Sequence, residues 1–223
     1  MKPIVITGPS ANTGKTELAC RLVAALGDCQ ALKITRFHRE SHCPVHGVDE
    51  HGDDNCDGCE EAPSGFELVT DQARLMAPGK DTQRLAKAGA QPVLWLRAAP
   101  HVFSYALGAA MKHFDSARPL VIEGNSAANV ESFEARVVLL WPAKSRGVKE
   151  SVYAALRRCN DLLLVEEEGS QVLPQSLLAA CAKIGVRIED LPEPVWLKAR
   201  WWLAAQEPKA WLAGMCSQVL TAK

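Results

Sequence analysis

One stretch near the start of the chain combines residue types and spacing that suit phosphate chemistry. The segment GPSANTGKT, residues 8–16, follows the short apolar run PIVIT and leads into a helical pattern over residues 14–26. A glycine turn between a strand and a helix points backbone N–H groups and the positive end of the helix dipole at one place, which suits an anion. This segment, called the 8–16 loop below, therefore predicts a phosphate-binding loop for a nucleotide.

The side chains of the 8–16 loop extend this prediction. Lys15 would bridge the β- and γ-phosphate oxygens and is the first candidate catalytic residue, and Thr16 would bind Mg²⁺ through its hydroxyl. Five residues separate Gly8 from the pair Gly14 and Lys15, one more than in the usual pattern. The residues predicted to contact the nucleotide are Gly8, Asn12, Thr13, Gly14, Lys15, Thr16 and Glu17.

A second stretch, SHCPVHGVDEHGDDNCDGC (residues 41–59), is rich in metal ligands. Cys43 and His46 form one pair with two intervening residues, and Cys56 and Cys59 form another. Two such pairs can close a tetrahedral site for Zn²⁺, although the same ligands suit iron or nickel. A loop without a core needs a metal to order it, which favours a structural ion. The alternative is a metal delivered to a client metalloenzyme, with His42 as a spare ligand.

The composition sets the class of protein. The chain has 223 residues, of which 48% are apolar and 23% charged, and its net charge is −1. These values are typical of a soluble globular protein and disfavour a nucleic-acid-binding surface over the whole molecule. No stretch of about twenty apolar residues predicts a membrane span, and the N-terminal residues do not resemble a signal peptide. We therefore expect a cytoplasmic protein whose eight cysteines stay reduced.

Apolar runs of strand length alternate with helical patterns along the chain. Continuous apolar strands separated by helices are typical of a mostly parallel sheet covered on both faces. The prediction is a three-layer α/β domain over residues 1–190, interrupted at 37–66 by the polar segment that we call the Cys/His loop. Residues 191–223 are expected to form a C-terminal extension of two short helices packed on the same domain. The apolar runs are residues 3–7, 31–35, 92–98, 119–124, 135–141 and 161–167.

Charged residues near the ends of these runs are further candidates. Glu123 lies near the end of run 119–124, and a carboxylate at the C-terminal end of a strand could bind Mg²⁺ or activate water. An ordinary strand-end surface charge is the alternative for Glu123. Lys33 and Arg36, near the end of run 31–35, could face a substrate. Asp81 and Thr82 begin a helical pattern, and they could simply cap that helix.

Two likenesses to known proteins add a family expectation. The spacing of the 8–16 loop and the pair Glu123 and Gly124 resemble dethiobiotin synthetase and the cobyric acid synthase group of P-loop NTPases. The segment GKDTQRLAKAGAQPV (79–93), and more loosely ALKITRFH (31–38), resemble the B protein of molybdopterin-guanine dinucleotide biosynthesis. The second resemblance implies a Mg²⁺-binding or switch role for Asp81 and a phosphate or substrate contact for Lys80.

These likenesses cover residues 1–140 in patches and imply a P-loop NTPase fold. They also imply an ATP- or GTP-hydrolysing accessory protein of metal- or molybdopterin-type cofactor biosynthesis that forms a homodimer. ATP is favoured, because the Asn-Lys-x-Asp motif expected of a guanine-specific enzyme is absent from the sequence. The candidate catalytic residues are then Lys15, Asp81 and Glu123, and the candidate Mg²⁺ ligands are Thr16, Asp81 and Glu123.

Two other functions fit the same sequence. One is an ATP-dependent ligase of the dethiobiotin synthetase kind, which acts on a small carboxylate and gives the Cys/His loop no chemical role. The other is a regulatory module that binds nucleotide and docks partners through the tryptophan-rich C-terminal part.

Overall fold

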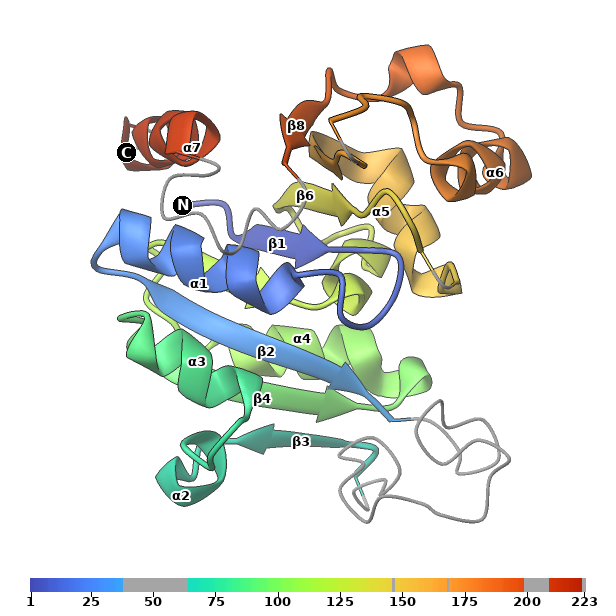
Figure 1. Ribbon diagram of the computed structural model, residues 1–223. Helices are drawn as coiled ribbons and strands as arrows, with labels where there is room; N and C mark the ends of the chain where they lie inside the picture. Colours follow the sequence, from blue (N-terminus) through green and yellow to red (C-terminus); the bar gives the residue numbers. More distant parts are fainter. Residues whose placement is uncertain (38–63, 146, 168, 199–208, 222–223) are drawn as a thin grey trace.

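The apolar runs form one eight-stranded sheet in a computed structural model, which describes residues 1–37, 64–145, 147–167, 169–198 and 209–221 (Figure 1). The strand order is β3-β4-β2-β5-β1-β6-β7-β8. Paired strands are parallel except for β3, which runs antiparallel to β4. The strands are β1 (Ile4–Thr7), β2 (Gln30–Arg36), β3 (Phe66–Val69), β4 (Val93–Ala98), β5 (Leu120–Glu123), β6 (Arg136–Trp141), β7 (Cys159–Val165) and β8 (Val195–Leu197).

Helices cover both faces of this sheet (Figure 1). Successive strand side chains point to opposite faces, so alternate positions build two separate cores. Ile4 and Ile6 of β1 pack in one core with α1, α3 and α7, whereas Val5 packs in the opposite core with α4. On that second face α5 and α6 cover β6 and β7. The helices are α1 (Lys15–Leu26), α2 (Gln72–Leu75), α3 (Asp81–Lys87), α4 (Phe103–Met111), α5 (Tyr153–Arg158), α6 (Gln175–Ile184) and α7 (Lys209–Thr221).

The strand order brings the ends of three strands together. From β1 the chain crosses to β2 and β4, and it then returns to β5, which lies between β2 and β1. It continues to β6 on the other side of β1. In open parallel sheets, ligands bind at the carboxyl edge where the strand order reverses. The carboxyl ends of β1, β2 and β5 therefore form the edge at which a ligand site is expected.

The two edge strands differ from the prediction made from sequence. Strand β3 starts at Phe66, the last residue assigned to the Cys/His loop, and pairs with β4. Strand β8 lies where the sequence predicts a helix, because Trp196 and Leu197 pack into cores on opposite faces of the sheet. The second helix predicted for residues 191–223 is present as α7. The strand replaces only the start of the first predicted helix, and most of that helix falls on residues 199–208, outside the described residues.

Some predictions fall on parts of the chain that the structure does not describe. The metal-ligand candidates Cys43, His46, Cys56 and Cys59 lie outside the described residues, as does the segment 199–208. The zinc site therefore stays a prediction from sequence. In the parts of the chain that the structure describes, no helix has both the length and the apolar character needed to cross a membrane.

Candidate functional site

The 8–16 loop connects β1 to α1 and folds around the side chain of Lys15. Its backbone takes the left-handed conformation at Asn12, with a φ of 56°, and at Gly14, with a φ of 90°. Asparagine and glycine tolerate this conformation best. The ammonium of Lys15 donates hydrogen bonds to the Ser10 carbonyl oxygen at 2.6 Å and to Thr13 Oγ1 at 3.1 Å. The loop thus curls around a cation just ahead of the N-terminus of α1.

Close packing and an amide clamp fix the start of the loop. A Cβ atom on Gly8 would lie 2.7 Å from Thr13 Oγ1 and 3.0 Å from the Leu140 carbonyl oxygen, so a side chain there would displace its neighbours. The side chain of Asn125 accepts a hydrogen bond from the Gly8 N–H at 3.0 Å and donates one to the Gly8 carbonyl oxygen at 2.9 Å. It also donates to Ser151 Oγ at 3.2 Å. Asn125 therefore ties the loop to the end of β5 and to the segment that follows β6.

Burial disfavours the charged form of Lys15. Burial lowers the pKa of Lys15 from 10.5 to about 8, and the attraction of Glu123 offsets this effect only in part. The positive charges of Lys33 and Lys149 lower the pKa further. An anion bound within the loop would favour the protonated form, because it would supply the negative charge that Lys15 lacks.

A second group of charged side chains, called the Lys33 cluster, lies beside the loop. Lys33 of β2 is directly opposite Glu123 of β5 in the parallel register. Its ammonium donates to Asp81 Oδ2 at 2.6 Å and also to Glu123 Oε2. Glu123 is only 2% exposed, whereas Asp81, the first residue of α3, is less buried. The two candidate carboxylates therefore meet at one ammonium group.

Lys33 and Asp81 each favour the charged form of the other. Burial by itself would lower the pKa of Lys33, but the attraction of Glu123 and Asp81 outweighs it, and this pKa is raised. Burial would likewise raise the pKa of Asp81, but Lys33 and a hydrogen bond from the Thr16 hydroxyl hold it below its ordinary value. Lys33 and Asp81 therefore stay charged at neutral pH. The bond from Thr16 connects the cluster with the 8–16 loop.

The 8–16 loop and the Lys33 cluster line the same cleft, which has a volume of about 1190 Å³. The cleft lies at the carboxyl edge of the sheet and contains the three candidate catalytic residues Lys15, Asp81 and Glu123. Arg36, which the sequence places near a substrate, also lines it. The full lining comprises segments 10–17, 33–37, 123–126 and 149–151 together with Asp81, Arg84 and Pro100.

The start of α3 is organised differently from a simple helix cap. The N-cap residue is Lys80, and its side chain makes no capping hydrogen bond. Its ammonium lies 5.9 Å from the centre of the Trp95 ring. The hydroxyl of Thr82 donates to the Leu75 carbonyl oxygen at 2.6 Å. Because these other contacts fix the start of α3, the carboxylate of Asp81 can accept the hydrogen bond from Lys33.

Glu17 has a structural role in addition to its place in the lining of the cleft. Its carboxylate accepts hydrogen bonds from Arg21 at 3.0 Å and from Arg84 at 2.8 Å. The pair with Arg21 lies within α1, and the pair with Arg84 joins α1 to α3 at the rim of the cleft. A direct contact between Glu17 and a nucleotide therefore stays a prediction.

Three residues of the site are absent from the prediction made from sequence. Asn125 and Ser151 hold the start of the 8–16 loop, and the backbone N–H of Lys149 donates to the Pro9 carbonyl oxygen at 2.8 Å. Asn125 had a detectable signal, because it is a polar residue just beyond the end of an apolar strand. No sequence signal marks Lys149 and Ser151, since these residues reach the loop only because β6 lies next to β1.

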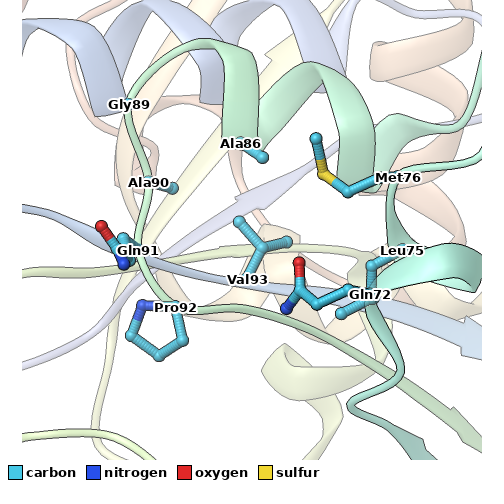
Figure 2. Close-up of a pocket in the computed structure, with 9 residues that line it drawn as sticks. All are labelled: Gln72, Leu75, Met76, Ala86, Gly89, Ala90, Gln91, Pro92 and Val93. Atoms are coloured by element: carbon cyan, nitrogen blue, oxygen red, sulfur yellow. The ribbon is translucent and has the colours of Figure 1, made fainter.

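A smaller pocket of about 380 Å³ lies at the amino end of β4, away from the carboxyl edge (Figure 2). Its polar side chains are the amides of Gln72 and Gln91, and the rest of its lining is apolar or glycine. Since neither amide titrates or acts as a nucleophile, this pocket offers no acid, base or nucleophile from its side chains. The large cleft is therefore the better candidate for chemistry.

The described cysteines do not form a second reactive or metal-binding centre. Burial raises the pKa of Cys20 to about 11 and that of Cys29 to about 12, so both thiols stay protonated at neutral pH. Among the described residues, no three His, Cys, Asp or Glu side chains gather in a way that could hold a metal ion.

No protein-family model matches the chain, and no curated protein matches its sequence. The family stays a prediction. What the protein does is therefore inferred from the geometry of the cleft and the residues that line it.

Proposed function

We propose that the protein is a P-loop NTPase that binds a nucleoside triphosphate with Mg²⁺ in the large cleft and hydrolyses it. The observation that carries the proposal is the convergence of Lys15 with the carboxylates of Asp81 and Glu123 at one edge of a parallel sheet. Such an arrangement would suit phosphates at Lys15 and a metal at the neighbouring carboxylates, next to a helix N-terminus.

The 8–16 loop supplies the phosphate-binding part of the proposed site. The left-handed residues Asn12 and Gly14 allow the backbone to curl so that successive N–H groups can face an anion. Lys15 adds a mobile positive charge, and its present partners in the loop are neutral oxygens that a phosphate group can replace. The charge on the transferring phosphoryl group would be stabilised by this cation.

The donor set near the loop suits Mg²⁺. Thr16 supplies a hydroxyl, and Asp81 and Glu123 supply carboxylates, which are the oxygen ligands that this ion prefers. The hydrogen bond between Thr16 and Asp81 supports this assignment, because it brings two of the three donors together. When bound, Mg²⁺ would neutralise phosphate charge and orient the triphosphate.

A wider biological role follows only from the sequence. The likenesses to cofactor-assembly NTPases favour an accessory protein of metal- or molybdopterin-type cofactor biosynthesis that forms a homodimer and uses ATP rather than GTP. The ligands Cys43, His46, Cys56 and Cys59 would hold one Zn²⁺, which is structural in the simpler version of the proposal and cargo for a client metalloenzyme in the other.

The size of the cleft supports a ligase as the second candidate. Its volume of about 1190 Å³ exceeds the roughly 300–1,000 Å³ that is usual for a site holding one small molecule. The lining continues past the 8–16 loop to Thr35, Arg36 and Phe37 at the end of β2. A small carboxylate bound there could be activated by the nucleotide, and in that case nucleotide consumption would depend on the second substrate.

The test is nucleotide binding and turnover by wild type and Lys15→Ala. Binding is followed with fluorescent ATP and GTP analogues, and turnover by phosphate release in the presence of Mg²⁺. We expect wild type to bind and hydrolyse a triphosphate, and Lys15→Ala to bind it at least tenfold more weakly, because a charged phosphate contact is lost. Hydrolysis by the variant should fall below detection while its circular dichroism spectrum is unchanged.

The matched control is Lys87→Ala, which removes a lysine from the far end of α3, outside the cleft. It should bind and hydrolyse nucleotide like wild type. Normal turnover by Lys15→Ala would show that the 8–16 loop is not the nucleotide site. Turnover of wild type that appears only when small carboxylates are added would favour the ligase.

A further inference from the structure

Lys33 holds the position in which a metal would meet the two candidate carboxylates. Its ammonium bonds to Asp81 Oδ2 at 2.6 Å and to Glu123 Oε2, so the nitrogen lies between the oxygens that would bind Mg²⁺. Magnesium binds oxygen at about 2.1 Å. An ion that bridged these two carboxylates would therefore have to occupy nearly the same volume as the Lys33 nitrogen.

Burial explains why the carboxylates favour a positive group at this point. The Glu123 side chain is 3% exposed and that of Lys33 is 17% exposed. A buried carboxylate without a partner is strongly unfavourable, and removal of one member of a buried pair leaves the other uncompensated. The lysine ammonium therefore stabilises the buried carboxylate, and another cation in the same position could replace it.

The geometry points to an exchange: in the ligand-free protein Lys33 is an internal substitute for the divalent cation, and Mg²⁺ binds to Asp81 and Glu123 only when the Lys33 ammonium leaves them. This inference rests on the Mg²⁺ site of the proposed function and adds its regulation. The site would stay closed to free Mg²⁺ until the phosphates of a nucleotide draw the ammonium away. Metal and nucleotide would then enter together.

Charge arithmetic gives the direction of the effect. With Lys33 in place, two carboxylates and one ammonium leave a net charge of −1 in the cluster. A neutral residue at position 33 would remove this positive charge and leave no occupant between the carboxylates. A divalent cation should therefore bind the variant more tightly than wild type, although wild type has the same carboxylates.

The test is Mn²⁺ binding to the full chain without nucleotide, measured by electron paramagnetic resonance of the free ion. Lys33→Met should bind one Mn²⁺ at least tenfold more tightly than wild type. Lys33→Arg keeps the positive charge and should bind as weakly as wild type. A double variant, Lys33→Met with Asp81→Asn, should lose the gain because one ligand is missing.

Lys87→Met is the control, because it removes a positive charge from the far end of α3, outside the cleft. Its Mn²⁺ affinity should change less than twofold. Thermal melting provides a second readout: Mg²⁺ should raise the melting temperature of Lys33→Met by several degrees and leave that of wild type unchanged. If Lys33→Met does not fold, Lys33→Gln is the second variant, because its neutral amide can donate hydrogen bonds, and the same gain is expected.

A folded Lys33→Met or Lys33→Gln protein that binds Mn²⁺ no more tightly than wild type would overturn the exchange. So would a gain that persists when Asp81 is replaced. These outcomes are separate from the nucleotide test, because no nucleotide is present. A protein that fails to bind ATP or GTP but gains Mn²⁺ affinity in Lys33→Met would disprove the NTPase proposal and retain the exchange at the carboxylates.

Discussion

The pKa values of two lysines in the same cleft are shifted in opposite directions, because their hydrogen-bonding partners differ. Lys15 and Lys33 are both largely removed from water. Lys33 has two carboxylates within hydrogen-bonding distance, and its pKa is raised. Lys15 bonds to a carbonyl and a hydroxyl oxygen, and burial lowers its pKa to about 8. Lys15 therefore has no negatively charged hydrogen-bonding partner, whereas the charge of Lys33 is already paired with two carboxylates.

The lowered pKa of Lys15 predicts a pH dependence of nucleotide binding. A bound phosphate favours the protonated lysine, so above pH 8 binding must take up a proton. The affinity should be nearly constant below about pH 8 and then fall by up to tenfold for each pH unit. Isothermal titration calorimetry between pH 7 and 9.5, in buffers of different ionisation enthalpy, measures both the affinity and the proton uptake.

Lys15→Arg is the control for this pH dependence. Arginine stays charged throughout this range, so the variant should show neither the extra loss of affinity nor the proton uptake. Equal pH profiles for wild type and Lys15→Arg would contradict the assignment of the effect to Lys15.

At the scale of elements, the close approach of β5 to β2 positions Glu123 against Lys33. Gly124, just after β5, makes this approach possible, because its φ of 144° lies in the region that favours glycine. A Cβ atom at this position would lie 3.0 Å from both Cβ and the carbonyl oxygen of Ile34 in β2. A side chain at position 124 would therefore push β5 and β2 apart next to the Glu123 carboxylate.

Gly124→Ala should destabilise the protein by about 1–3 kcal/mol through backbone strain, with a further penalty from the contact with β2. It should also weaken nucleotide binding, because Glu123 and Asn125 flank the altered residue. Urea denaturation measures the stability. Gly108→Ala is the control with the opposite sign: Gly108 is exposed on α4 with open space around its Cβ position, and alanine should stabilise this helix by about 0.5–1 kcal/mol.

Gly124→Ala as stable as wild type would mean that the strands can separate at no cost. The geometry of the Lys33 cluster would then be less constrained than its contacts indicate.

At the scale of the whole molecule, the Cys/His loop is the largest feature whose role is predicted from sequence alone. The four ligands Cys43, His46, Cys56 and Cys59 predict about one equivalent of tightly held zinc, measured by elemental mass spectrometry of protein purified without oxygen. The double variant Cys56→Ser/Cys59→Ser should lose it, because two of the four ligands lose their thiolates.

A second double variant, Cys20→Ser/Cys216→Ser, removes the same number of thiols from other parts of the chain and should keep the zinc. Zinc released when ATP is added would favour cargo over a structural ion. If wild type contains no metal, the Cys/His loop does not bind one. The ligase and the accessory NTPase would then be equally well supported.

The prediction of the fold from sequence succeeded where the information is local. Strands β1, β2, β4, β5, β6 and β7 coincide with the apolar runs to within about two residues, because a buried strand needs an unbroken apolar stretch. The 8–16 loop was visible for a similar reason, since its two glycines, lysine and threonine all lie within nine residues. The edge strands β3 and β8 were missed because their short sequences pair only through contacts with distant strands.

The sequence by itself determined the six inner strands of the sheet, the 8–16 loop and the identity of the candidate carboxylates. Only the tertiary structure decided that β5 lies between β2 and β1, and hence that Lys33 meets Glu123 and Asp81. It also placed Asn125 on Gly8. Periodicity reports which face of an element is buried, but the partner across that face is selected by packing among all the elements together. The Lys33 cluster is the product of that selection.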